Sequence, residues 1–130
     1  MKRPFTLLVL MTIVGAFNSG CALFLVGAGA AAGAGTFAYV RGELRSAEQV
    51  RLTRAYDAAL RAMDDLQFKV TRAEKDALAG QIVARRADDT KITVNLRKQS
   101  EAVTDVRVRV GMFGDESLSR IILERMQRYY

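Results

Sequence analysis

The sequence predicts an α+β domain: a two-layer sandwich in which a four-stranded antiparallel meander sheet is covered by two helices, in the order α-β-β-β-β-α. Apolar residues recur with the helical period over residues 43–66 and again near the end of the chain. Between these stretches, four segments alternate apolar and polar residues with the period of a strand. Their links are short and polar, which favours neighbouring antiparallel strands.

The composition excludes several classes of functional site. The chain has 130 residues, room for one domain, and a formal net charge of +6. It lacks His, which excludes Ser-His-Asp and Cys-His catalytic arrangements. Its single Cys excludes an internal disulfide, and without His it also excludes the usual zinc sites. Carboxylate chemistry is the common catalytic option that remains, but the acidic pairs Asp64-Asp65 and Asp88-Asp89 fall at a predicted helix end and a predicted turn, where such residues are ordinary. We therefore expect no enzyme, no catalytic residue, no metal and no cofactor.

Residues 1–20 have the layout of a secretory signal peptide. Lys2 and Arg3 form a positive start, and an apolar run of 13 residues extends from Phe5 to Phe17. This run is short for a membrane-spanning helix, which takes about 20 residues. The sequence therefore predicts that the domain is exported and that residues 1–20 are removed.

The residues around the lone Cys21 resemble the processing site of bacterial lipoproteins. The small residues Ser19 and Gly20 precede it, although Asn18 stands where those proteins usually have an aliphatic residue. The resemblance implies a diacylglyceryl group on the Cys21 sulfur, cleavage before Cys21 and acylation of the new amino group by a fatty acid such as palmitate. Ala22 stands where Asp favours inner-membrane retention, which implies the outer membrane, with the domain facing the periplasm. The alternative is an ordinary buried cysteine in an uncleaved apolar anchor.

Residues 21–42 form a segment rich in Gly and Ala between the lipid and the domain, which we place at residues 43–130. Residues 22–40 carry no charge and are about long enough to lie in or span a bilayer. One interpretation is a membrane-associated helix that associates with copies of itself through small residues, namely Gly27, Gly29, Gly33 and Gly35. The others are a flexible apolar tether and, with the least support, a dinucleotide-binding loop.

Two helices are predicted in the domain. The first covers residues 43–66 and has one apolar face, formed by Leu52, Tyr56, Ala59, Leu60, Met63 and Leu66. Ser46 is the predicted N-cap of its stronger part. The second begins at Asp115 or Glu116 and ends near Tyr129, with Asp115 as the N-cap. We expect Tyr129 and Tyr130 to pack or fray at the terminus.

The four strands are predicted within residues 66–71, 78–85, 91–97 and 105–110. If the even-numbered residues face the helices, the odd-numbered ones face outward. Gly111 and Gly114 then form the joint between the last strand and the second helix, and Phe113 between them is expected to tuck under the start of that helix.

The outward residues form a basic stripe that we consider a candidate anion-binding face. Six basic side chains stand there against Asp105 alone: Lys69, Arg85, Lys91, Arg97, Arg107 and Arg109. Such a stripe can bind a lipid headgroup or an acidic envelope glycan. The alternative is a solvated face whose charges prevent sheets from associating. Nucleic acid is not expected, because the domain is exported and this face has no aromatic residue for stacking bases.

Three stretches resemble a group of small bacterial lipoproteins that carry a domain of unknown function. They are the start at Cys21-Ala22 with YVRGEL at residues 39–44, the segment at residues 76–96, and VRVRVGMFGDESLSRIILERM at residues 106–126. The resemblance implies a lipid-anchored envelope protein with a compact α+β domain and no assigned activity. We therefore expect a non-enzymatic envelope lipoprotein whose domain binds an envelope partner. The alternatives are an anion-binding module and a glycine-zipper protein that oligomerises in the membrane.

Overall fold

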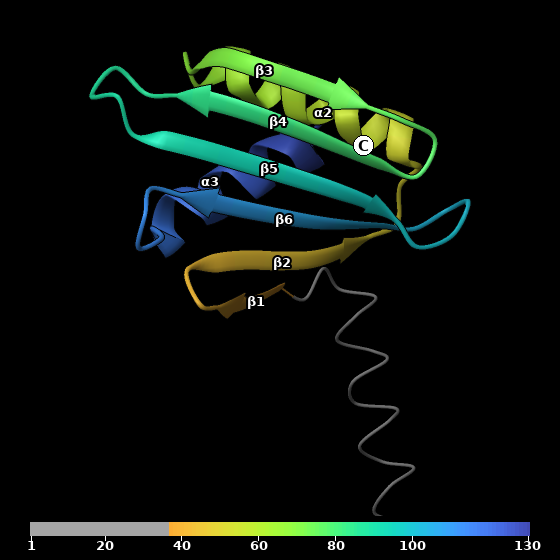
Figure 1. Ribbon diagram of the computed structural model, residues 1–130. Coiled ribbons are helices and arrows are strands. Elements are labelled where there is room, and N and C mark those ends of the chain that lie inside the picture. The colour runs from red at the N-terminus through yellow and green to blue at the C-terminus, as the bar shows by residue number, and fades with distance from the viewer. Residues whose placement is uncertain (1–36) are drawn as a thin grey trace, which may run out of the picture. The chain divides into compact units, whose positions relative to one another are not determined.

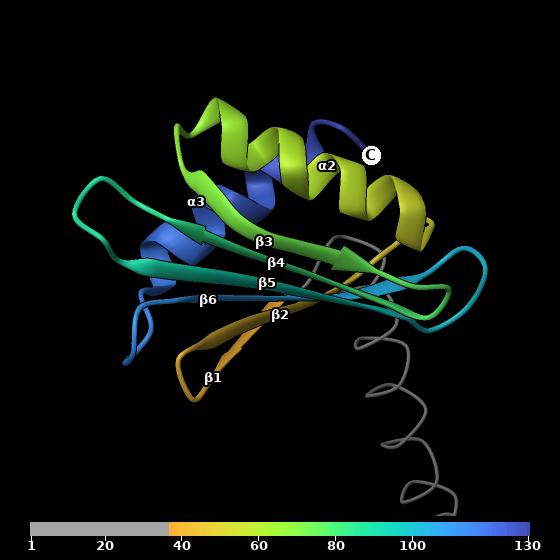
Figure 2. The same ribbon diagram turned by 45° about the horizontal axis from the view of Figure 1, so that its top comes forward.

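The computed structural model describes residues 37–130, which form a six-stranded sheet with two helices on one of its faces (Figures 1 and 2). All neighbouring strands are antiparallel, and they lie in the order β1-β2-β6-β5-β4-β3. The elements in chain order are β1 (Phe37–Val40), β2 (Glu43–Glu48), α2 (Leu52–Asp65), β3 (Lys69–Lys75), β4 (Ala79–Arg85), β5 (Lys91–Lys98), β6 (Thr104–Val110) and α3 (Glu116–Gln127).

Several predictions concern residues that lie outside the described part of the chain. These are the signal peptide at residues 1–20, the lipid attachment at Cys21, the self-association through Gly27, Gly29, Gly33 and Gly35, and most of the apolar segment at residues 22–40. The last four residues of that segment are described, and they form the edge strand β1.

The α+β class is confirmed, whereas the predicted four-stranded sheet and the order α-β-β-β-β-α are wrong. Residues 43–48, predicted as the start of a helix, form the strand β2, and the helix α2 begins only at Leu52. With β1, this adds two strands beyond the edge of the predicted sheet. Ser46, the predicted helix N-cap, is a buried residue in the middle of β2.

The reason for this error lies in two polar residues of β2 that face the core. Leu44, Ser46 and Glu48 are all buried, so β2 alternates like the other strands but with polar side chains inside. Ser46 Oγ donates a hydrogen bond to Glu48 Oε1 at 2.5 Å, and Gln127 Nε2 of α3 donates to the same oxygen at 3.1 Å. Because these bonds satisfy the polar groups, the strand can form without the apolar alternation that marks strands in a sequence.

The core lies between the helices and the inner face of the sheet (Figure 2). Helix α2 packs against β3, β4 and β5, and α3 packs against β2 and β6. Gly80 faces the Tyr56 ring of α2, where a Cβ atom would lie 2.8 Å from the nearest ring carbon. The other inward residues of β4, β5 and β6 are buried, except for the partly buried Lys98 at the end of β5: Ile82, Ala84, Ile92, Val94, Leu96, Thr104, Val106, Val108 and Val110.

The C-terminal residues pack against α2. Arg54 Nη2 donates a hydrogen bond to the carbonyl oxygen of Tyr130 at 2.8 Å, and Tyr129 Oη donates to Asp65 Oδ2 at 2.6 Å. The Tyr130 phenol is buried, and this burial, with the Glu48 carboxylate nearby, raises the pKa of Tyr130 above its ordinary value. These contacts show that the two tyrosines pack at the terminus and do not fray.

The joint between β6 and α3 differs from the prediction in one respect. Asp115 caps α3 as predicted, because its Oδ1 accepts a hydrogen bond from the Leu118 N–H at 3.0 Å. The Phe113 side chain, expected to tuck under the helix, is 90% exposed. The space beside the helix start is filled by backbone instead: a Cβ atom on Gly114 would lie 2.4 Å from the Cα of Gly42, in the β1–β2 turn.

We predict that Gly114→Ala destabilises the domain more than Gly111→Ala does. Both glycines have positive φ angles, +87° and +70°, which cost an alanine about 1–2 kcal/mol each. Only Gly114 also touches another backbone; at Gly111 the nearest atom to a new Cβ would be Thr90 Cγ2 at 3.7 Å. Urea unfolding followed by circular dichroism measures the difference, and equal losses would contradict the backbone contact between Gly114 and Gly42.

Candidate functional site

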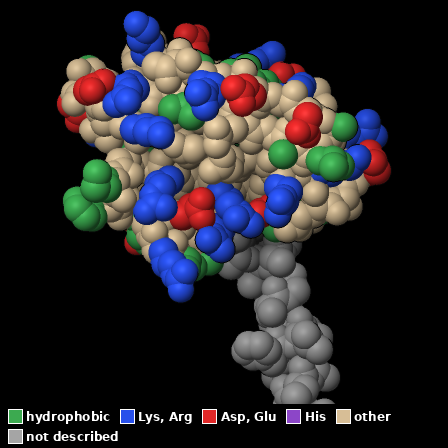
Figure 3. Space-filling view, in the orientation of Figure 1, with side chains coloured by type: hydrophobic (Ala, Val, Ile, Leu, Met, Phe, Trp, Pro, Cys, Tyr) green, Lys and Arg blue, Asp and Glu red, His purple; other side chains and the backbone are tan. Residues whose placement is uncertain are grey.

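The face of the sheet opposite the helices is uncovered in the described part of the chain. Figure 1 looks onto this outer face, with α2 and α3 behind the strands. The outer face carries eight basic residues, which are Arg45, Lys69, Arg72, Arg85, Lys91, Arg97, Arg107 and Arg109, and three acidic ones, which are Glu43, Glu74 and Asp105. Figure 3 shows these charges as blue side chains spread over the face with red ones between them.

The outer face holds the whole positive excess of the domain. Its eight basic and three acidic side chains give an excess of five positive charges. The rest of residues 37–130 contain ten basic and eleven acidic side chains, so they carry one net negative charge. An attractive potential for anions is therefore concentrated on the one face that no helix covers.

The six basic residues predicted from the sequence all lie on this face. Strand pairing places Lys69, Arg85 and Lys91 in one row across β3, β4 and β5. Arg107 and Arg109 stand on β6, and Arg97 is opposite Asp105. The six residues therefore share one face, with three acidic residues and not Asp105 alone, while anion binding by this face stays a prediction.

Sequence reasoning missed the contributions of β2 and of the end of β3. Glu43 and Arg45 were assigned to a helix, so their outward direction was not recognised. Arg72 and Glu74 follow a bulge in β3 between Val70 and Arg72, which shifts the alternation by one residue. An even-odd rule therefore fails for β3 beyond Val70, and no signal in the sequence marks the bulge.

Ion pairs divide the basic residues into two groups. Four of them lie beside carboxylates, at distances of 2.8 Å for Arg107–Asp105, 3.0 Å for Arg45–Glu43, 3.4 Å for Arg85–Asp89 and 3.6 Å for Arg72–Glu74. Within residues 37–130, no carboxylate pairs with the other four, which are Lys69, Lys91, Arg97 and Arg109. These four are the outer-face cations best able to bind an external anion.

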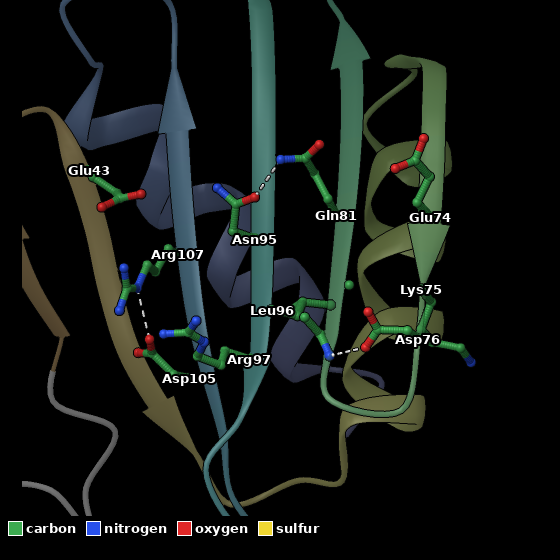
Figure 4. A pocket seen from close by; sticks show the side chains of 12 residues that line it. Glu43, Glu74, Lys75, Asp76, Gln81, Asn95, Leu96, Arg97, Asp105 and Arg107 are labelled. Carbon is green, nitrogen blue, oxygen red and sulfur yellow. Dashed lines mark hydrogen bonds and ion pairs between the residues drawn. The ribbon is translucent and has the colours of Figure 1, made fainter.

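A shallow hollow of about 540 Å³ crosses the middle of the outer face (Figure 4). Gln81 and Asn95 lie at its centre, where Gln81 Nε2 donates a hydrogen bond to Asn95 Oδ1 at 2.8 Å. The pair Asp105–Arg107 lines it on β6, and Arg97 lines it on β5. The neutral amides suit hydroxyl groups. The charged lining is mixed, with the basic side chains Lys75, Arg97 and Arg107 and the acidic side chains Glu43, Glu74, Asp76 and Asp105, so the positive excess of the outer face lies around the hollow and not in it.

The arrangement offers less for metal binding. Within the described residues, no three side chains of the types His, Cys, Asp or Glu lie where they could hold a metal ion together. Two of the carboxylates that line the hollow, Glu43 and Asp105, are paired with arginines two residues along the same strand.

Asp76 stands in the β3–β4 turn, at the edge of the hollow. Its Oδ1 accepts hydrogen bonds from the backbone N–H groups of Leu78 at 2.7 Å and Ala79 at 2.8 Å. These bonds to the charged carboxylate lower the pKa of Asp76 below its ordinary value of 3.8. The carboxylate therefore holds the turn together and serves the hollow only as its border.

One protein family matches nearly the whole length of the chain. Residues 4–129 match the family described as "Protein of unknown function (DUF3568)". The chain belongs to this family. No curated protein matches the DUF3568 chain. Membership of this family assigns no ligand or reaction to the outer face.

No helix within residues 37–130 of the DUF3568 chain has the length and apolar character needed to cross a membrane.

We predict that the stability of the DUF3568 domain falls at acid pH partly through Asp76. Because its folded pKa is lowered, the contribution of Asp76 is complete above pH 3.8 and is lost as the pH falls through the folded pKa. Asp76→Asn should therefore unfold more easily than the wild type at neutral pH, with a difference that shrinks at acid pH. Glu124→Gln, on the exposed side of α3, is the control.

The measurement is the free energy of unfolding from urea titrations between neutral and acid pH. A constant difference between Asp76→Asn and the wild type across this range would contradict the assigned role.

Proposed function

We propose that this DUF3568 protein is a non-enzymatic, lipid-anchored protein of the bacterial envelope, and that residues 37–130 are its binding module. The anchor is the lipid on Cys21, on the outer membrane, with the module facing the periplasm. The sequence supports this step: a positive start, a 13-residue apolar run and small residues precede the lone Cys21.

The outer face supports the second step, in which the module binds an anionic partner. This face has an excess of five positive charges, and four of its cations have no carboxylate partner within residues 37–130. Charges that served only solubility would be expected on all surfaces, as mixed signs. Here the remaining surface is close to neutral, so the outer face has an asymmetry that fits a partner of opposite charge.

The proposal assigns no reaction to the module. Asp105 and Glu43 line the hollow, but Arg107 and Arg45 neutralise them at 2.8 Å and 3.0 Å. Each of these two carboxylates is therefore engaged by a side chain of its own strand.

The anchor predicts a specific mass for the protein extracted from membranes. We expect the mass of residues 21–130 plus a diacylglyceryl group and a fatty acyl chain, because processing cuts before Cys21. In Cys21→Ser this lipidated species should disappear, since serine has no thiol to modify. Intact-mass spectrometry of both forms makes the measurement, and a wild-type mass equal to all 130 residues without lipid would overturn the anchor.

The charged face predicts a loss of anion binding on charge reversal. Arg97→Glu with Arg109→Glu should weaken retention on a heparin matrix by about tenfold in affinity at low ionic strength, because two unpaired cations become anions. The matched control is Arg51→Glu with Arg128→Glu, which makes the same charge change at exposed positions on the helix side.

The full-length protein in detergent is applied to the matrix and eluted with a NaCl gradient. Equal shifts in elution for the two double variants would show that only net charge matters, and would overturn the outer face as a binding surface.

A further inference from the structure

Two large apolar side chains project from the loop between β6 and α3. Met112 is 81% exposed and Phe113 is 90% exposed, more than any other large apolar residue of the described chain. We call these two residues the apolar tip. Figure 1 shows the loop that follows β6 at the left edge of the sheet, and Figure 3 shows hydrophobic side chains projecting on that side of the molecule. Exposed apolar residues that stand together indicate a contact with another apolar phase or partner.

The fold holds the tip outward. Gly111 and Gly114, on either side of it, have φ angles of +70° and +87°. A Cβ atom on Gly42 would lie 2.6 Å from the carbonyl oxygen of Phe113, so the tip backbone rests directly on the β1–β2 turn. On the other side, Asp115 caps α3. Because backbone fills the space beneath the loop, the two side chains have no place to fold inward.

The tip adjoins the end of the outer face where Lys69, Lys91 and Arg109 stand. The carboxylates at the same end are Glu43, opposite Arg109, and Asp88 and Asp89 of the β4–β5 turn, and each of them pairs with an arginine. Arg109 Nη2 donates a hydrogen bond to the Met112 carbonyl oxygen at 3.3 Å, and the Gly111 N–H donates to the Lys91 carbonyl oxygen at 2.7 Å. Lys69 lies at the same end of the sheet, across β4 from Lys91. Neither Lys69, Lys91 nor Arg109 pairs with a carboxylate within residues 37–130.

We propose that the apolar tip inserts into the interfacial layer of a phospholipid bilayer, with the neighbouring cations on anionic headgroups. An apolar tip bordered by unpaired cations matches a bilayer, in which anionic headgroups lie just above acyl chains. This inference deepens the proposed function, on which it rests, by naming the bilayer as the anionic partner. The chain between the proposed lipid anchor and the domain is long enough for the tip to reach the membrane, because the 16 residues from Cys21 to Phe37 span at most about 55 Å.

Tryptophan fluorescence tests the insertion directly, because the chain contains no Trp. Phe113→Trp places a single indole at the tip. The matched control is Leu78→Trp, which places it at another exposed apolar position, 67% exposed, in the β3–β4 turn at the opposite end of the sheet. The full-length acylated proteins are reconstituted into vesicles of phosphatidylcholine and phosphatidylglycerol whose acyl chains carry bromine, a contact quencher of indole.

We expect a blue shift and loss of emission for Phe113→Trp, and neither for Leu78→Trp. In vesicles of phosphatidylcholine alone, the quenching at position 113 should be smaller. Adding Lys69→Glu and Lys91→Glu to Phe113→Trp should also reduce it, whereas adding Arg51→Glu and Arg128→Glu should not. Met112→Ser with Phe113→Ser should unfold at the wild-type urea concentration, which shows that the tip does not serve stability.

Equal emission at positions 113 and 78 would overturn the inference. Flotation of the vesicles reports the anchor separately. Protein that floats with the vesicles but shows no quenching at position 113 would contradict insertion of the tip and would agree with the lipid anchor. Quenching at position 113 in protein that carries no lipid on Cys21 would contradict the anchor and would agree with insertion of the tip.

Discussion

The pairing of β2 with β6 is the constraint on which the functional surfaces of this domain depend. It joins residues 43–48 to residues 104–109, which are far apart in the chain. The pairing directs Glu43 and Arg45 onto the outer face, and it buries Glu48 under α3. It also places the β1–β2 turn beneath the loop that presents the apolar tip. Without β1 and β2 the sheet would end at β6, so the tip would lose the turn beneath it and the outer face would lose Glu43 and Arg45.

A buried polar cluster accompanies this pairing. Glu48 accepts hydrogen bonds from Ser46 on the same strand and from Gln127 on α3, so the carboxylate ties the sheet to the last helix. The hydroxyl of the partly buried Tyr130 lies near the same carboxylate, but within residues 37–130 it has no hydrogen-bond partner. Polar groups in a core restrict packing to arrangements that satisfy them. This cluster therefore fixes α3, and with it the helix start at Asp115, against β2.

The two proposed surfaces follow from how a one-sided sheet distributes its residues. Helices on one face take up the apolar side chains, so most charged side chains of the strands stand on the other face. The exceptions are Glu48, Lys75 and Lys98. In this domain that exclusion collects five excess positive charges, while the helix side remains close to neutral. The apolar tip lies at the edge of this charged face. A flat anionic phase could contact both surfaces, which is why the two proposals support each other.

The sequence by itself determined the α+β class, the position of α3, the end of α2 but not its start, and the alternation that directs the basic residues of β4, β5 and β6 outward. These features depend on local periodicity, which a single segment displays without its neighbours. The sequence did not reveal β2, because buried hydrogen bonds replace the apolar residues that mark a strand, nor the bulge in β3.

Only the tertiary structure decided the exposure of Phe113, since the backbone that excludes it from the interior comes from Gly42, about 70 residues earlier in the chain. The ion pairs of the outer face are local by contrast, since each joins residues two or four apart in the chain.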